Sequence, residues 1–470
     1  MATNPETKGK VRIERDSMGE MKIPAEAYYG ASTQRAVLNF PISDLRFPRR
    51  FIEAVGLIKW GAAQANRDLG RLDEKLAAAI TQAAEEVIEG KLDEHFVVDV
   101  YQTGSGTSTN MNANEVIANR AAEILGGERG ARGLVHPNDH VNTGQSSNDV
   151  IPTAVHLSAL LALEQVLIPA VRQLRGELEK KSKEFWEVIK TGRTHLQDAT
   201  PVRLGQVFQG YAGQMARAER RLATARDELA EVALGGTAVG SGINTHPKFA
   251  AMVCRLVSER AGVEIRETDS HFQAQATLDN VVAASGSIRT VAVSLHKIAN
   301  DIRLLASGPR TGLRELDLPE VQPGSSIMPG KVNPVIAESL IQVACQVVAA
   351  DAAVVQSGQW SFFELNTMLP LAGYNLVLAI ENLGAATKNF AGVCVAGLTA
   401  TERGPAMVEQ GLAIVTGLVP RIGYDLAAEI AHEAAESGKT IREVAKERTE
   451  LTDAELDEAL DPFKMTEPSE

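Results

Sequence analysis

Five helical stretches between residues 153 and 390 constrain the fold more than any other feature of the sequence. Each is far longer than the mean helix of a globular protein, which has about 12 residues, and apolar residues recur at helical spacing within them. Pro169 predicts a kink in the first stretch. The sequence therefore predicts an all-α fold built on an elongated bundle of long helices. The stretches cover 153–185, 205–232, 274–308, 335–357 and 371–390.

One of these stretches, 335–357, is apolar on nearly every side. A helix that is apolar all round is normally buried, but a bundle of five helices leaves part of each helix facing outward. Packing between subunits would cover that surface, so we expect a homo-oligomer. Aromatic residues make up only 4% of the chain, which favours helices packed on helices over a β-sandwich.

The segments before the bundle have a different character. Residues 1–49 are interrupted by prolines and are predicted to be irregular, with helical patterns starting near Phe51. Asp73 is placed to cap the N-terminus of a helix. Residues 102–115 and 136–149 are rich in Gly, Asn and Ser and are predicted to be loops. Polar loops held on a helical scaffold often carry function.

The tail from residue 403 contains shorter amphipathic helices and ends in an acidic stretch. The pattern therefore indicates three domains. They are an N-terminal domain at 1–145, a central five-helix bundle at 146–402 and a C-terminal helical domain at 403–470.

The charge balance restricts the class of partner. Lys and Arg number 47 against 60 Asp and Glu, which gives a net charge of −13 at pH 7. Broad binding to nucleic acid or to an anionic membrane surface is therefore not expected. A site for an anionic ligand would need cations placed against the overall sign of the chain.

Three cysteines, Cys254, Cys345 and Cys394, lie in apolar runs and match no metal-binding spacing. We expect buried thiols and a reducing compartment. The first ten residues lack the apolar core of a signal peptide. No uninterrupted apolar stretch approaches the roughly 20 residues of a membrane span. These features predict a cytoplasmic protein with no membrane partner.

Residues 323–338, PGSSIMPGKVNPVIAE, hold the densest group of chemically useful side chains. Ser325 and Ser326 lie in a loop of small residues, and Lys331 and Asn333 follow them. Hydroxyls, free backbone N–H groups, an ammonium and an amide are the components of an anion-binding site. The segment therefore predicts a site for an anionic ligand.

Two other kinds of site are not indicated. The run TGSGT at 103–107 lacks the Lys-Ser/Thr ending of a phosphate-binding loop, and no predicted strand precedes it. No set of His, Cys and carboxylate residues has the spacing of a metal site. We expect neither a cofactor nor a metal.

The segment 323–338 resembles the signature of the fumarase/aspartase superfamily. Other segments extend the resemblance over nearly the whole chain and bring it nearest to the class II fumarases. These segments are RIERDSMGE (12–20), TQRAVLNFPIS (33–43), QTGSGTSTNMNANEVIAN (102–119), HPNDHVNTGQSSND (136–149), GRTHLQDATPV (192–202) and ALGGTAVGSGINTHP (233–247).

The resemblance implies a fumarate hydratase. Such an enzyme eliminates water from (S)-malate, reversibly and with anti geometry, to give fumarate in the citric acid cycle. The resemblance also implies the superfamily's long-helix fold with smaller N- and C-terminal domains. It implies a homotetramer in which three subunits build each active site, with no cofactor and no catalytic metal.

By the same resemblance, Ser325 is the base that takes the C3 proton of malate, and His195 pairs with Glu338 where the hydroxyl leaves. Proton loss beside a carboxylate builds a dianionic intermediate, which donors and cations must stabilise. A leaving hydroxyl needs an acid. Which of Ser325 and His195 moves which proton stays open. The residues that match the family's substrate ligands are Ser105, Gly106, Thr107, Ser146, Ser147, Asn148, Thr194, Ser326, Lys331, Val332 and Asn333.

His136, Pro137, Asn138 and Asp139 match a second, peripheral dicarboxylate site of class II fumarases. Three positions before the histidine the family commonly has a basic residue, and this chain has Gly133. The function of this second site therefore stays open.

Two other functions fit the same fold. Aspartate ammonia-lyase shares the signature, but it typically has Gln at the position of His195 and a first region closer to AGAGT than to TGSGT. A non-catalytic bundle is the remote alternative, because lens crystallins have been recruited from this superfamily. The intact set of candidate catalytic residues favours the hydratase over both.

Overall fold

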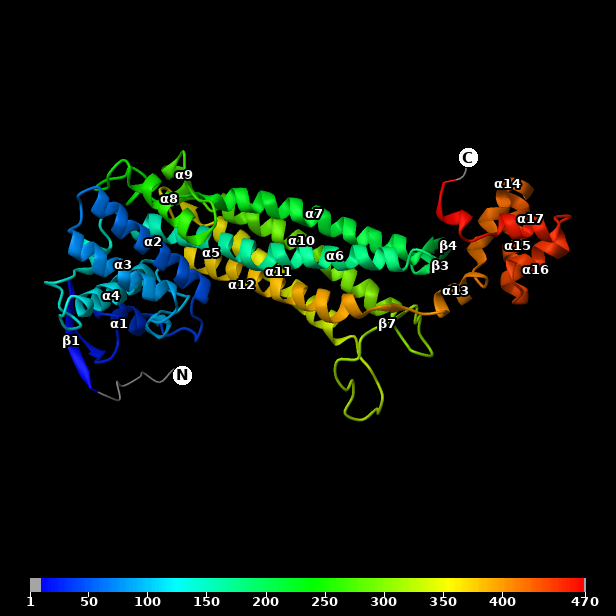
Figure 1. Cartoon of the computed structure of the whole chain (residues 1–470), viewed down its shortest axis with the longest axis horizontal. Coiled ribbons are helices and arrows are strands. Elements are labelled where there is room, and N and C mark those ends of the chain that lie inside the picture. Colours follow the sequence, from blue (N-terminus) through cyan, green and yellow to red (C-terminus); the bar gives the residue numbers. More distant parts are fainter. Residues whose placement is uncertain (1–9, 469–470) are drawn as a thin grey trace. The chain divides into compact units, whose positions relative to one another are not determined.

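The predicted long helices are all present in the structure, a computed structural model that describes residues 10–468 (Figure 1). The first is irregular just before Pro169, where a π-helical turn replaces the α-helix. Proline lacks the N–H that an α-helix would use, which gives this turn a local cause, while the kink expected at Pro169 stays a prediction. The helices are α5 (Ser147–Ala162), continued by the turn Leu163–Leu167 into α6 (Ile168–Glu184), then α7 (Leu204–Ala230), α10 (Asp279–Leu305), α11 (Val335–Gly358) and α12 (Leu369–Asn389).

Contacts within the chain group it into two compact units, and each long helix contributes residues to both. Unit 1 comprises Met1–Pro169, Arg220–Ala292 and Cys345–Gly384. Unit 2 comprises Ala170–Glu219, Val293–Ala344 and Ala385–Glu470. The three-domain division from the sequence stays a prediction.

Unit 1 contains a helical layer in which α2 (Arg49–Asp68) packs on α3 (Glu74–Ile88), on α5 and on α8 (Phe249–Ala261) (Figure 1). The start of α3 follows the prediction, because the Asp73 carboxylate accepts the N–H groups of Lys75 and Leu76. Other elements of this unit are β5 (Glu231–Val232), β6 (Arg266–Glu267), α9 (His271–Ala276), β8 (Ser361–Phe362) and β9 (Leu365–Asn366).

The prediction of an irregular segment at 1–49 is wrong for three elements. A hairpin forms from β1 (Val11–Asp16) and β2 (Gly19–Pro24), and α1 covers Ala31–Asn39. No side chain caps α1 locally. Its first N–H groups, those of Ser32 and Thr33, donate instead to the buried carboxylate of Glu115. A partner so distant in sequence leaves no local pattern to read.

The loop predicted at 102–115 is also largely helical, because α4 runs over Thr107–Ile124. Asn110 and Asn112 are buried within it. Their amide groups donate to the Ser147 hydroxyl and to the His95 carbonyl, respectively. Hydrogen bonds to other segments satisfy the NH₂ groups of these side chains, so a composition typical of loops forms a buried polar helix.

Unit 2 holds the hairpin of β3 (Ile189–Thr194) and β4 (Gln197–Arg203) and the C-terminal helices. Ile189 of β3 belongs to the core that these helices build around Leu418, Ile430 and Val444. The core therefore anchors the base of the hairpin. The other elements are β7 (Leu316–Asp317), β10 (Thr399–Ala400), α13 (Arg403–Val408), α14 (Val419–Ile422), α15 (Tyr424–Ser437), α16 (Ile441–Arg448) and α17 (Asp453–Ala459).

Helix α11 exposes an apolar face in the single chain. Two helical segments, Ser147–Glu184 and Val335–Gly358, are long and apolar enough to cross a membrane by length and composition alone. The most apolar window of the first is 72% buried, as in a core helix, whereas that of α11 is only 33% buried. Val348 on α11, for example, is 42% exposed.

The prediction of three buried thiols is correct for two of them. Cys254 and Cys394 are buried, and burial raises the pKa of each thiol to about 12. Cys345 is exposed, against the prediction, because it lies on the open face of α11.

Candidate active site

Two of the motif regions singled out in the sequence meet in unit 1. Gly106 precedes α4 with φ +72°, a conformation that suits glycine. A Cβ at this position would lie 2.7 Å from Ile151 of α5, so the turn sits directly against that helix. Ser105 and Thr107 flank the glycine, and their hydroxyls lie 2.8 Å apart. Close packing thus brings this pair of hydroxyls to α5.

The start of α5 carries the next three candidates. Ser146 caps the helix, its hydroxyl accepting the N–H of Asn148, and the Asp149 carboxylate accepts the N–H of Ser146 in return. The Ser147 hydroxyl accepts a hydrogen bond from Asn110. A helix N-terminus carries partial positive charge and favours anions, so the start of α5, with its hydroxyl and amide side chains, is suited to an anion.

Asp149 ties this helix start to the segment 233–247. Its second carboxylate oxygen accepts the N–H groups of Gly235 at 3.1 Å and Thr237 at 3.0 Å, and the Asn148 amide donates to the Ala238 carbonyl. Burial raises the pKa of Asp149, an effect that its backbone donors and Lys59 oppose. Three motif regions from distant parts of the sequence are therefore joined within unit 1.

In unit 2, Thr194 and His195 occupy the tip of the β3–β4 hairpin. Thr194 pairs with Gln197, so His195 and Leu196 form a two-residue turn. Their φ values are +58° and +60°, as in a type I′ turn, which normally takes Asn or Gly. Two non-glycine residues in this conformation store strain, which is common at functional sites. The tip points into solvent, and Leu196 is 73% exposed.

A buried ion cluster supports this hairpin. Glu315 is 2% exposed, and its carboxylate lies 3.1 Å from the ammonium of Lys190 and 2.7 Å from the guanidinium of Arg193. Burial lowers the pKa of Lys190, and Glu315 opposes that shift. The two cations are on β3, so the cluster fixes the strand that presents His195. The sequence contains no motif that points to Glu315.

The segment 323–338 places Ser325 at the centre of a tight loop. Its Oγ accepts the N–H groups of Ile327 at 3.2 Å and Met328 at 2.9 Å. A Cβ at Gly324 would lie 2.0 Å from the Lys331 carbonyl, so only glycine fits there. The loop is open to solvent, with Ser326, Lys331 and Val332 exposed. Two backbone donors therefore meet the hydroxyl that the sequence singled out as the base.

The predicted partners within unit 2 do not meet in the single chain. Glu338 lies in the first turn of α11, and its N–H donates to the Pro334 carbonyl. Among residues 10–468, no hydrogen bond or ion pair joins His195 to Glu338 or to Ser325. Within the described residues of one chain, these catalytic candidates are therefore not linked directly by a hydrogen bond or an ion pair.

The candidate second dicarboxylate site forms a compact turn. His136 precedes the π-helical turn Pro137–Val141, and its Nδ1 lies 3.2 Å from the Asp139 carboxylate. Gly133 adds no side chain, and the neighbouring Arg132 pairs with buried Glu115 at 3.6 Å. The histidine therefore already faces an acidic group, and the nearest arginine in the sequence has a partner elsewhere.

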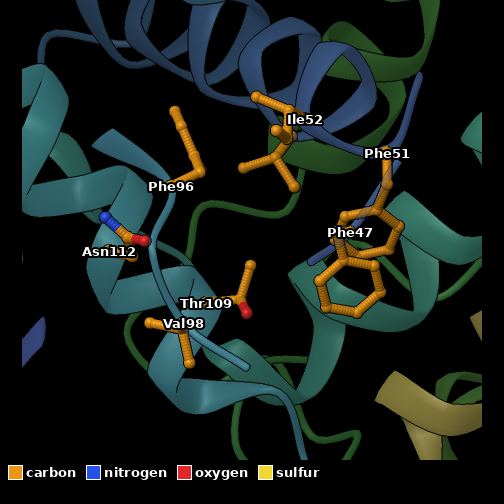
Figure 2. Close-up of a pocket in the computed structure, with 8 residues that line it drawn as sticks. Phe47, Phe51, Ile52, Phe96, Val98, Thr109 and Asn112 are labelled. Atoms are coloured by element: carbon orange, nitrogen blue, oxygen red, sulfur yellow. The ribbon is translucent and has the colours of Figure 1, made fainter. Parts of the chain in front are cut away.

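A small cavity in unit 1 is not a second candidate. Figure 2 shows its lining, with Phe47 and Phe51 side by side and Thr109 and Asn112 on α4. The two phenyl rings stack with their centroids 3.8 Å apart. The volume of about 10 Å³ suffices for roughly one water molecule, so the cavity is too small for a dicarboxylate.

Comparison with known proteins identifies the family. Residues 19–349 match the lyase family model, and residues 414–467 match that of the fumarase C C-terminus. Over 456 residues the chain is 55% identical to the class II fumarate hydratase of Halobacterium salinarum, an alignment covering 97% of each chain. The chain belongs to the class II fumarase family. The human mitochondrial fumarate hydratase is 49% identical over 460 residues, covering 97% of this chain and 90% of that one.

Solved structures of a class II fumarase and of a fumarate lyase share the fold. The enzyme from Schistosoma mansoni matches with a TM-score of 0.93 at 38% identity, covering 97% of this chain and 99% of that one. A fumarate lyase:delta crystallin from Brucella melitensis bound to cobalt also matches with a TM-score of 0.93, at 46% identity. That match covers 98% of this chain and 100% of the other. The family and the long-helix fold predicted from the motifs are thus confirmed. Within residues 10–468, no group of three or more His, Cys, Asp or Glu side chains is arranged to hold a metal ion.

Proposed function

We propose that this chain is a fumarate hydratase that interconverts (S)-malate and fumarate in the citric acid cycle. The observation that carries the proposal is the environment of Ser325, whose Oγ accepts two backbone N–H groups in a loop that also contains Lys331 and Asn333. Close relatives with the name fumarate hydratase, at up to 55% identity over nearly the whole chain, support the same reaction.

Deprotonation of malate is assigned to Ser325. A serine hydroxyl is a weak base, but donors aimed at Oγ stabilise its alkoxide, and the N–H groups of Ile327 and Met328 supply two such donors. The alkoxide takes the C3 proton, and the electron pair moves onto the adjacent carboxylate, which becomes a dianionic enediolate while the second carboxylate keeps its single charge. Lys331 and Asn333 bind the enediolate and stabilise its added charge.

Departure of the hydroxyl is assigned to His195 with Glu338. Hydroxide is a poor leaving group, so a proton must reach the oxygen as the C–O bond breaks. An imidazole oriented by a carboxylate, acting directly or through one water, supplies it. The base and the acid then act on opposite faces of malate, which gives anti elimination.

Substrate contacts are assigned to two groups of side chains. The first lies in unit 1, where Ser105, Thr107 and the start of α5 are packed together. The second lies in unit 2, at Thr194 and in the loop from Ser326 to Asn333. Hydroxyl and amide donors at a helix N-terminus suit the two carboxylates of malate or fumarate.

We further propose a homotetramer in which three subunits complete each site. Two observations support it. The first is the exposed apolar face of α11. The second is that no hydrogen bond or ion pair joins His195 to Glu338 in the described part of one chain. A face of that kind on a soluble enzyme marks a protein interface. We place the enzyme in the cytoplasm, a reducing compartment in which free thiols persist.

Assays of the purified chain with malate, fumarate and aspartate test the reaction. We expect reversible interconversion of malate and fumarate, followed by the absorbance of fumarate, and no release of ammonia from aspartate. Ammonia release would make the chain an aspartate ammonia-lyase. A folded chain inactive on all three substrates would contradict the proposed function and indicate a structural role.

A further inference from the structure

Lys59 is a fully buried lysine that the proposed mechanism does not use. It lies in the middle of α2, in the apolar run GLIKWGAA, and its side chain is 0% exposed. Burying an ammonium is costly unless it is paired or hydrogen-bonded. An apolar residue would fill this position of the core at lower cost, so the lysine must provide something that an apolar side chain does not.

The Lys59 ammonium holds the segment that leads into α5. It donates to the Asn142 side-chain carbonyl and to the Gln145 side-chain carbonyl, both at 2.9 Å. The Asn142 amide in turn donates to the backbone carbonyl of Gln145, which directly precedes Ser146. The lysine thus fixes the conformation of the chain immediately before the helix cap.

A second connection runs through Asn110 of α4. Its amide donates to the same Asn142 carbonyl at 3.3 Å and to the Ser147 hydroxyl at 3.0 Å. The side-chain oxygen of Asn110 is buried and has no hydrogen-bond partner among the described residues. Lys59, Asn142, Asn110 and Ser147 therefore form one polar network beneath the start of α5.

We propose that Lys59 is a positioning residue for the dicarboxylate: through Asn142, Asn110 and Gln145 it orients the Ser147 hydroxyl and the N-terminus of α5, and it places a positive charge beneath them. The inference rests on the proposed function, in which Ser146, Ser147 and Asn148 bind substrate. It assigns Lys59 to ground-state binding of the anion and not to proton transfer.

The environment of Lys59 links this role to pH. Burial lowers the pKa of Lys59 to about 7, and the field of Asp149 opposes that shift. Helices α3, α4, α5 and α8 pack on α2, and within the described residues Asp149 of α5 is the charged group that acts on the ammonium. A neutral amine can still donate both observed hydrogen bonds, but it carries no charge.

The sign of the pH effect follows from that difference. A bound dianion favours the charged form of a nearby lysine and so raises its pKa. Binding near pH 7.5 therefore takes up a fraction of a proton. As pH rises through the pKa of the free protein, the ammonium is lost and the apparent affinity for dicarboxylate falls.

Steady-state kinetics on Lys59→Met test the positioning role. We expect KM for malate at pH 7 to rise about tenfold or more, with kcat within about threefold of wild type, because hydrogen bonds from a charged group are lost. Val87→Ala, which opens a cavity in α3 against α2, is the matched control for lost stability. An unchanged KM in a folded Lys59→Met enzyme overturns the inference.

Calorimetry with succinate, a dicarboxylate that cannot undergo the reaction, gives a readout that a structural role would not move. Titrations in buffers of different ionisation enthalpy measure proton uptake on binding. We expect uptake in wild type at pH 7.5 to exceed that in Lys59→Met. Equal uptake in the two proteins would contradict the charge assignment. This measurement needs no turnover, so its outcome is separate from the test of the proposed reaction.

If Lys59→Met does not fold, Gln145→Met tests the same network from its more accessible end. We expect a smaller rise in KM, about threefold or more, because one of the two acceptors remains. Proton uptake should persist, since the lysine is retained. A wild-type KM in Gln145→Met would contradict the proposed connection.

Discussion

Ser325→Ala is expected to lower kcat for malate dehydration by about 10³-fold while the protein still binds succinate. Alanine removes the Oγ that accepts the N–H groups of Ile327 and Met328, and the loss of a positioned base typically costs 10²–10⁴-fold. Lys331 and Asn333 remain to hold a carboxylate, so binding survives.

The neighbouring hydroxyl provides the comparison for this variant. Ser326→Ala removes the same group, a hydroxyl, from the next residue of the same loop. Ser326 is assigned to substrate binding alone. We expect it to raise KM by up to about tenfold with little change in kcat. Rate measurements on both variants, with calorimetry for succinate affinity, distinguish the two serines. If Ser325→Ala kept near wild-type kcat, Ser325 would not be the base.

His195→Gln has the second largest expected effect, a loss of about 10²-fold or more in kcat/KM for malate. The hydroxyl of malate leaves only with a proton, whereas the ammonium group of aspartate departs as neutral ammonia. A glutamine cannot act as the acid, so the hydratase loses general acid catalysis. Glu338→Gln should also lower kcat/KM for malate, but by a smaller factor, since the imidazole remains.

The fold should tolerate His195→Gln. The position lies at the exposed tip of a hairpin, so the substitution disturbs no buried packing. Circular dichroism tests folding, and His432→Gln, at an exposed histidine on α15 with no assigned role, is the control. A folded His195→Gln enzyme that keeps more than about a third of the wild-type kcat/KM would make this histidine structural.

The long helices could be predicted from the sequence because their information is local. Apolar residues at a spacing of 3–4 specify a buried face wherever the helix packs. The boundaries of α10 and α11 accordingly lie close to the predicted 274–308 and 335–357. The start of α3 was predictable for the same reason, since a cap acts within three residues.

Elements held by distant partners could not be predicted. On α4 the NH₂ groups of Asn112 and Asn110 donate to His95 and Ser147, and α1 begins against Glu115. Local composition in both segments indicates a loop, and tertiary hydrogen bonds override it. The β3–β4 hairpin has neither an Asn-Gly turn nor clean alternation, so it left no local signal either.

The same distinction, between local signals in the sequence and contacts made by the fold, applies to the residues of the candidate site. Ser325 and His195 could be singled out from the sequence because they lie in segments that match the family's motifs. Glu315, which supports the hairpin of His195, and Lys59, which supports the start of α5, act through contacts that only the fold creates. Lys59 did leave one trace, a lone cation in an apolar helical run. A charge that interrupts a buried face indicates a polar network behind it.

Subunit complementation tests the central claim, that residues kept apart in one chain form the active site when chains assemble. The measurement is malate dehydration by a 1:1 mixture of His195→Asn and Ser325→Ala chains after subunit exchange. If the histidine and the serine of each site come from different subunits, random assembly gives about a quarter of the sites both native residues. We therefore expect about a quarter of wild-type activity from two variants that are each nearly inactive alone. A mixture no more active than its components would contradict the shared site.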